Sequence, residues 1–264
     1  MKDKSANDKD IRLTREYNDY KNILDNLEKT GSMRVMKQFG ENLMKRINDK
    51  NRLQQTKKYI YIAKKDLYGY KSFYDSEDYS NAIYHIEQSI EKIAKGFAFI
   101  LLEKPSPKKI GHNPDKVITN FFKENKIFEI MNKNFRPSLF DIIDNELGDE
   151  KDIINIDKKK YESIDIILDI LYKNINSTLN FKNFPDENSY YGNLGFNIAI
   201  MSVGIYIFSK LLYKHEAYTR YPDGIKQPDD YTLEFGIVNL SVEISNKMEK
   251  IISMISDIIQ THLN

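Results

Sequence analysis

The clearest pattern of hydrophobic and polar positions lies between Tyr79 and about Leu102. Apolar side chains recur there at alternating steps of three and four residues, at Ile83, Ile86, Ile90, Ile93 and Phe97. This spacing puts them in one stripe of an α-helix. Charged and polar residues fill the other faces, at His85, Glu87, Gln88, Glu91, Lys92 and Lys95. Such a helix buries its apolar stripe against other helices, so the pattern predicts a helical bundle.

The same rhythm predicts further helices along the chain. They are expected at about 11–30, Met36–Ile47, 54–74, from Pro114 to about Phe122, 158–172, 194–212 and 232–262, with a short one near 136–143. Asp78 is the expected N-cap of the helix that starts at Tyr79. Pro105 and Pro107 end that helix, because a proline cannot continue one. Residues 173–192 and 214–231 are expected as loops.

No segment shows the period-two alternation that is typical of strands. Few glycines and prolines, 11 and 7 among 264 residues, also argue against a loop-rich or all-β fold. The predicted fold class is therefore all-α, an antiparallel up-and-down bundle.

The most apolar stretch, Leu194–Leu212, is nearly long enough to cross a bilayer. Asn197, Ser202, Ser209 and Lys210 interrupt it, and no second such stretch exists. We therefore expect a buried central helix and no membrane contact.

Composition excludes several kinds of chemistry. The chain has no cysteine, which rules out disulfides, thiolate zinc sites and cysteine nucleophiles. Its first residues lack the apolar stretch of a secretory signal, so a cytoplasmic protein is expected. The net charge is +1, but the charges are unevenly distributed along the chain. Residues 1–70 hold 17 Lys and Arg against 10 Asp and Glu, which suits either a nucleic-acid contact or an ordinary solvated helix surface.

Candidate ligand-binding residues are few. The four histidines lack the spacing of a zinc site, and no glycine-rich phosphate loop is present, so neither a metal nor a cofactor is expected. The best candidates lie in a proline-fixed loop after the apolar helix, namely Arg220, Tyr221 and Asp223, with His215 just before them. The alternative is an Arg–Asp pair that merely ties the loop down. His112 lies before another helix, whose N-terminus favours anions, although the commoner role of a histidine there is capping or packing.

Four pieces of the sequence resemble the HEPN family, the helical domains named for nucleotide binding in higher eukaryotes and prokaryotes. They are Asp66–Leu67, the string Tyr79–Lys95 with its Gln88, Glu91, Lys92 and Lys95, Gly111–His112, and Thr219–Asp223 followed by Tyr231–Thr232. The resemblance covers about 54–123 and 205–262. By this resemblance, residues 1–50 are an N-terminal helical extension. Residues 51–264 are a HEPN-like bundle, interrupted by a helical insertion at about 124–204.

The resemblance implies a compact bundle that dimerises, and several activities. Many HEPN members are metal-independent ribonucleases of toxin–antitoxin and antiphage systems that use an Arg-x4-6-His motif. Others pair with a small nucleotidyltransferase, or bind nucleotides without catalysis. In this sequence no arginine stands five to seven positions before a histidine. The nearest imitation is Lys210 before His215, and a lysine lacks the planar fork that grips phosphate.

The expected function is therefore a non-catalytic HEPN-like homodimer that binds a nucleotide or RNA, or a nucleotidyltransferase-type partner. The first alternative is a ribonuclease with a degenerate site formed by His215 and Arg220. The second is a structural dimer with no ligand.

Overall fold

The computed structural model describes residues 32–106, 108, 114–124, 187–221 and 227–263, with single residues at 145, 147, 162, 164 and 166. Its elements are α2 (Ser32–Ile47), α3 (Lys50–Asp75), α4 (Tyr79–Leu101), α6 (Asp115–Glu124), α11 (Glu187–Leu212), α12 (His215–Tyr218), the 3-10 turn η2 (Pro228–Asp230) and α13 (Gly236–Leu263). No strand occurs in these ranges. The all-α prediction is confirmed for the described part of the chain.

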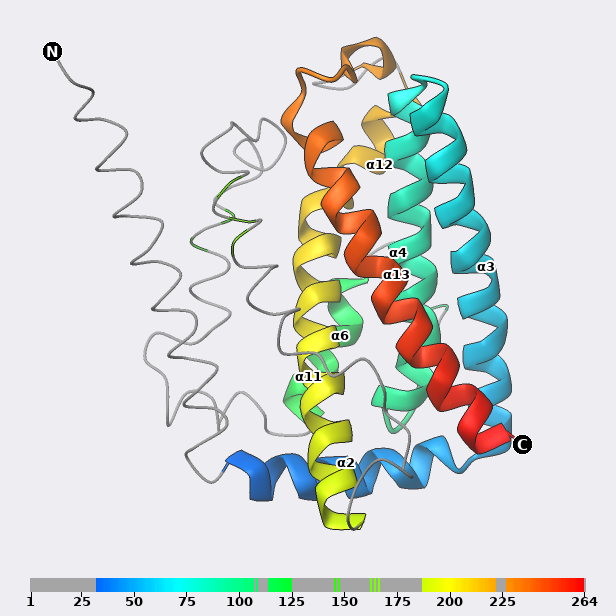
Figure 1. The fold of residues 1–264 in the computed structure, drawn as a ribbon, viewed down its shortest axis with the longest axis vertical. Helices are drawn as coiled ribbons and strands as arrows, with labels where there is room; N and C mark the ends of the chain where they lie inside the picture. The colour runs from blue at the N-terminus through cyan, green and yellow to red at the C-terminus, as the bar shows by residue number, and fades with distance from the viewer. Residues whose placement is uncertain are drawn as a thin grey trace, which may run out of the picture.

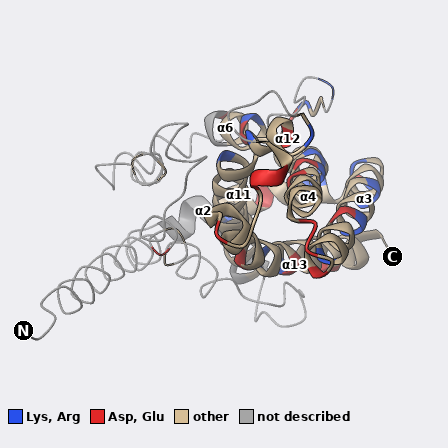
Figure 2. Cartoon of the chain, turned by 90° about the horizontal axis from the view of Figure 1, so that it is seen from above, with Lys and Arg blue, Asp and Glu red and all other residues tan. Residues whose placement is uncertain are grey.

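Four long helices form an antiparallel bundle. In Figure 1, α3 and α11 run upward while α4 and α13 run downward, and α2 crosses beneath them. Figure 2 shows the same four helices from their ends, with α6 and α12 beside α11 and α4. Helix α4 contacts α3, α11, α13, α2, α6 and α12, so it is the centre of the packing. This confirms that the Tyr79–Leu102 segment packs against other helices of a bundle.

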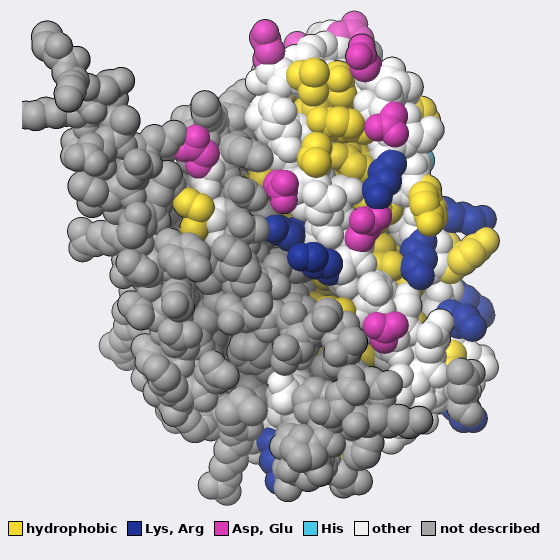
Figure 3. All heavy atoms as spheres, in the orientation of Figure 1, with side chains coloured by type: hydrophobic (Ala, Val, Ile, Leu, Met, Phe, Trp, Pro, Cys, Tyr) yellow, Lys and Arg dark blue, Asp and Glu magenta, His cyan; other side chains and the backbone are white. Residues whose placement is uncertain are grey.

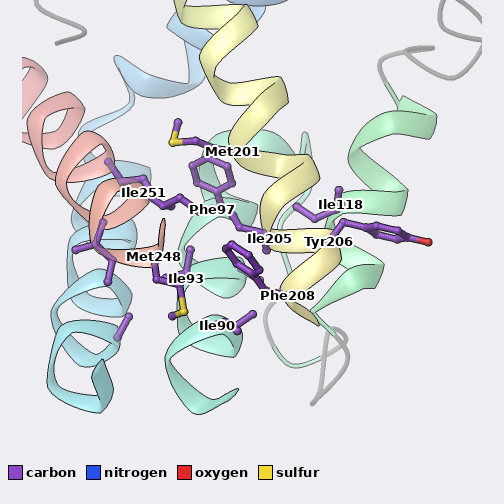
Figure 4. Packing of buried hydrophobic residues seen from close by; sticks show 14 of the residues in the cluster. Ile90, Ile93, Phe97, Ile118, Met201, Ile205, Tyr206, Phe208, Met248 and Ile251 are labelled. Atoms are coloured by element: carbon purple, nitrogen blue, oxygen red, sulfur yellow. The ribbon is translucent and has the colours of Figure 1, made fainter. Parts of the chain in front are cut away.

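The predicted stripe of α4 forms the middle of the core. Ile83, Ile86, Ile90, Ile93 and Phe97 are all buried. Figure 4 shows Ile93 and Phe97 near Met201 and Phe208 of α11, and near Met248 and Ile251 of α13. Burial of these side chains removes apolar surface from water, which is the main stabilising contribution to such a bundle.

Aspartates cap the N-termini of α3 and α4. The Asp49 carboxylate accepts hydrogen bonds from the backbone N–H groups of Asn51 and Arg52, at 3.0 and 3.3 Å. Asp78 accepts one from the N–H of Asn81 at 3.3 Å, as the sequence predicted for this helix. Each cap satisfies donors that have no partner within the helix. Helix α3 begins four residues before the predicted start, because Asp49 supplies a cap that the apolar pattern alone did not show.

Two arginines satisfy the carbonyl groups at the C-terminus of α4. Arg52 donates to the carbonyl oxygens of Phe99, Leu102 and Glu103, at 3.1, 2.8 and 2.7 Å. Arg46 donates to the carbonyl of Leu101. Burial lowers the pKa of Arg46, while the charge of Glu124 raises it. A cation at a helix C-terminus also complements the helix dipole, so the end of α2 and the first turn of α3 together cap the C-terminal end of α4.

Replacing Arg52 with alanine should therefore destabilise the protein by about 2 kcal/mol, since it removes charged donors from three carbonyls. The stability of Arg52→Lys should lie between that of the natural protein and that of Arg52→Ala, because lysine keeps the charge but loses the planar fork. Urea unfolding followed by circular dichroism measures both. Equal stability of all three proteins would show that water replaces the guanidinium at no cost.

Helix α11 is longer than the sequence predicted. Residues 187–192, expected as the end of a loop, form its first turns, and Tyr190 is fully buried. The loop prediction was wrong there because its asparagines and aromatics lack an apolar rhythm, whereas the segment is held by packing against α2, which is distant in sequence. Gly40 of α2 lies so close that a Cβ atom there would fall 2.0 Å from the carbonyl oxygen of Tyr191.

The apolar part of α11 lies inside the bundle. The stretch Tyr190–Leu212 passes a test of length and hydropathy for a membrane span, but 88% of the tested window is buried within the protein. The expected central helix is confirmed. Lys210, at its C-terminal end, points to α6, where its Nζ atom lies 3.9 Å from Asp115.

Three other predicted boundaries change. Helix α13 begins at Gly236 rather than at about Thr232, and the predicted loop 214–231 contains the short helix α12 and the turn η2. Helix α6 follows Pro114 as expected, with Val117, Ile118 and Phe121 buried. The predicted helices at 11–30 and near 136–143, and almost all of 158–172, lie outside the described residues.

Candidate functional site

Helix α12 lies against α4 and begins with the candidate residue His215, while Arg220 and Tyr221 follow its end. His215, its first residue, is fully buried, although it was predicted to lie in a polar loop. Its Nδ1 atom lies 2.7 Å from the Tyr231 hydroxyl. The His215 ring also makes edge contacts with the rings of Tyr231 and Phe235. Since Tyr231 is buried, the pKa of its hydroxyl is raised. His215 is therefore part of an aromatic cluster that anchors η2 to α12.

Arg220 lies on the surface beside this cluster, with 44% of its side chain exposed. Its guanidinium lies over two tyrosine rings, 5.2 Å from the centre of Tyr84 and 5.3 Å from that of Tyr221. Its Nη1 atom contacts Glu216 of the same turn at 3.4 Å. Tyr221 is exposed and Tyr84 is half-buried. The three side chains form a cationic surface with aromatic faces, an arrangement suited to a phosphate and a base.

Two buried glutamates lie on the face of α4 that the sequence predicted to be polar. Glu87 and Glu91 are only 2% and 1% exposed, so a solvent-facing pair was the wrong expectation. They are buried because α4 has neighbours on every side, including α12. Glu91 accepts hydrogen bonds from Lys92 and Lys95, at 2.8 and 2.6 Å. Burial raises its pKa, but the two lysines outweigh this, and the net effect lowers it.

Glu87 has the opposite environment. Burial raises the pKa of its carboxyl to about 8, and the charges of Glu216 and Glu91 add to the effect. One carboxyl oxygen accepts a hydrogen bond from the Gln88 amide at 2.8 Å, while Oε1 has no hydrogen-bond partner among the described residues. At neutral pH this group is mainly protonated. A protonated carboxyl near Glu216 gives the α4–α12 contact a polar group that responds to pH.

His85 is partly buried at the α3–α4 contact. Its ring stacks on Phe73, with centres 5.1 Å apart, and Nδ1 lies 3.5 Å from the Asp66 carboxylate. The structure therefore brings together Asp66 and His85, two residues of the HEPN-like pattern. They pair on the α3–α4 contact, whereas Arg220 and Glu216 lie at α12.

The predicted site residues do not gather at one point. His215 is inside the protein, whereas Arg220 and Tyr221 face solvent, and Lys210 points to Asp115 instead of His215. Asp223 and His112 lie outside the described residues. Tyr84 and Glu216 were not predicted as site residues from the sequence, although the position of Glu216 carries a recognisable signal. Glu216 stands four residues before Arg220, which is the spacing of an ion pair on one helix face.

The described residues include no group of three or more His, Cys, Asp or Glu placed to hold a metal ion. The side chains at the α12 surface offer hydrogen bonding, charge and ring stacking. We call Tyr84, Glu216, Arg220 and Tyr221 the α12 site.

The fold and this surface define an all-α bundle centred on one helix, with an Arg–Tyr surface where the chain leaves α11. Comparison with protein families adds that the HEPN domain model matches residues 56–136. The match begins in α3 and includes α4 and α6. The HEPN resemblance is thus confirmed for this segment, and a HEPN domain indicates an RNA-related or defence function. Comparison with curated proteins gave no match, and neither did comparison with solved structures.

Proposed function

We propose that this chain is a non-catalytic HEPN-like protein that binds a nucleotide or RNA at the α12 site. The observation that carries the proposal is the separation of His215 from Arg220. A metal-independent RNA cut needs a base for the 2′-hydroxyl and a cation for the phosphate, both within hydrogen-bond reach of the same substrate. Here the imidazole is enclosed and bonded to Tyr231, while the guanidinium is on the surface.

Binding, unlike cleavage, does not need a base beside the cation. The α12 site supplies the groups that binding does need. The edge of the Arg220 guanidinium offers paired N–H donors to a phosphate, and the bond to Glu216 is long enough to be exchanged for a stronger one. The exposed ring of Tyr221 can stack on a base. A nucleotidyltransferase-type partner, a homodimer and a role in toxin–antitoxin or antiphage defence belong to the same proposal, and their support is the HEPN resemblance.

We expect Arg220→Ala to weaken binding of a fluorescent ATP analogue about tenfold or more, because it removes the charged hydrogen bonds to phosphate. The melting temperature should hardly change, since Arg220 is exposed. Lys116→Ala, an exposed cation of α6, is the matched control. His215→Ala should hardly change binding of the ATP analogue. It should lower the melting temperature, because it leaves a cavity in the buried aromatic cluster.

The alternative functions give different results in the same assays. RNA degradation in chelator that both His215→Ala and Arg220→Ala abolish would identify a degenerate ribonuclease and end the proposal. If Arg220→Ala affects only thermal stability, the loop is purely structural. If neither ATP nor RNA binds at all, the α12 site has no nucleotide role.

A further inference from the structure

A second surface of the bundle lies along α3, away from the residues of the α12 site. Its lysines Lys57, Lys64 and Lys71 recur every seven residues. Tyr61 stands four residues after Lys57, and Tyr68 stands four residues after Lys64. Seven residues are almost two helical turns, so each set lies in a row with a spacing of about 10 Å. The tyrosines are 59% and 73% exposed, far more than an aromatic core residue would be. Figure 3 shows basic and hydrophobic side chains alternating along the side where Figure 1 places α3.

This row borders a groove between α3 and α13. One hollow of about 370 Å³ is lined by Lys64, Tyr68 and Lys71 on one side, and by residues of α13 on the other. A second hollow of about 210 Å³ continues it past Lys57 and Tyr61. Both hollows share Lys64, Ser256 and Gln260, so they form one groove along the helices.

The two walls of the groove have different chemistry. From Lys50 to Lys65, α3 has six basic residues and no acidic one, and its Asp66 points to His85. The α13 wall is mixed: Glu249, Ser253, Ser256, Asp257 and Gln260 are polar, whereas Ile252, Ile259 and Leu263 are apolar. Glu249 pairs with Lys71, so that one carboxylate and one lysine of the row offset each other until a phosphate takes the place of Glu249. Lys65 lies over the ring of Tyr61, with Nζ 4.7 Å from its centre, which keeps this ring beside a cation.

We propose that this groove binds single-stranded RNA. Lysines in a row neutralise successive phosphates, exposed tyrosines stack on bases without regard to sequence, and the hydroxyl and amide groups of α13 hydrogen-bond to base edges. A second copy of the chain fits the charge less well. A symmetric contact through α3 would place two lysine-rich rows against each other. The groove and the α12 site are formed by different residues, so either can exist without the other.

The test is fluorescence anisotropy of a labelled 12-nucleotide RNA of mixed sequence, measured over a range of salt. We expect the triple variant Lys57→Gln, Lys64→Gln, Lys71→Gln to bind at least tenfold more weakly, and to lower the salt slope by about 2, since each phosphate contact on a single strand contributes about 0.7. Tyr61→Ser with Tyr68→Ser should weaken binding about tenfold or more and leave the slope unchanged, because stacking releases no counterions.

A triple variant with the same change in charge provides the control. Lys45, Lys108 and Lys116 are exposed lysines outside the groove, and changing all three to glutamine should alter the affinity by about twofold or less. An equal loss in both triple variants would overturn the proposal, since binding would then depend only on total charge. The proposal would also be overturned if the protein binds no RNA and the tyrosine variant loses a dimer that the natural protein forms. The groove would then be a contact between copies of the chain. Arg220→Ala should leave RNA affinity in the groove nearly unchanged, so failure here is separable from failure of the α12 site.

Discussion

Gly40→Ala should destabilise the protein by about 3 kcal/mol, a large effect for one added methyl group. In most exposed helix positions this change would stabilise, because alanine has the better helix propensity by about 1 kcal/mol. Here the new Cβ atom would lie 2.0 Å from the Tyr191 carbonyl oxygen and 2.7 Å from its carbon. Both atoms belong to the α11 backbone, which no rotamer change can move aside. Helices α2 and α11 would have to separate, and the packing of Phe39 and Leu43 would suffer.

Gly69→Ala is the matched control for this prediction. The Cβ atom added at this position in α3 would also meet a neighbour, the Nδ1 atom of His85 at 2.9 Å. That atom is at the end of a side chain that is 28% exposed and can shift by a few tenths of an ångström, unlike backbone, so the net change should be within about 1 kcal/mol. Urea unfolding of both variants measures the difference. Equal effects would mean that α2 is not held against α11 in the way described.

The helices could be predicted from the sequence because each one repeats an apolar rhythm or carries a recognisable cap. The Ile83–Phe97 stripe, the Asp78 cap and the ending at Pro105 needed only local information. The first turns of α11 could not be predicted in this way. Tyr190 is buried and its hydroxyl lies 3.3 Å from His262 of α13, and Tyr191 packs against Gly40 of α2; both partners are far away in sequence, and no local pattern marks these contacts.

The candidate site was only partly predictable for a similar reason. Arg220 and Tyr221 were found because a loop with an arginine and a fixed proline is a local signal. The burial of His215 depends on Tyr231 and Phe235, whose approach follows from the path of the chain through η2. Likewise, a glutamate on the polar side of an amphipathic helix normally faces water, and only the arrival of α12 encloses Glu87.

This enclosure gives the second large prediction, a pH-dependent gain in stability for Glu87→Gln. The pKa of Glu87 is about 8 in the folded protein and 4.5 in the unfolded chain. The folded state therefore holds more protons between these two values, and the stability of the natural protein falls as pH rises through this window. The glutamine variant lacks this loss and still accepts the hydrogen bond from Gln88. At pH 7 it should be more stable by about 2–3 kcal/mol, with no difference below pH 4.5.

Glu91→Gln, one helical turn further along α4, should show the opposite sign. Lys92 and Lys95 hold the pKa of the Glu91 carboxyl below its usual value, so its contribution is present at neutral pH and is lost as pH falls through the folded pKa. At pH 7 its replacement should cost about 3 kcal/mol, because two poorly exposed ammonium groups lose their counter-charge.

Thermal or urea unfolding of the three proteins between pH 4 and pH 9 measures both effects. The informative quantity is the difference between each variant and the natural protein, since other carboxylates contribute equally to all three curves. Parallel curves for Glu87→Gln and the natural protein would show that Glu87 is ionised and solvated, so that α12 does not close over it. Curves that diverge above pH 4.5 would instead show that α12 keeps a neutral carboxyl beneath the Arg220 surface. A ligand that binds Arg220 and draws it away from Glu216 would then change the charge that Glu87 experiences, and its binding would depend on pH in the same window.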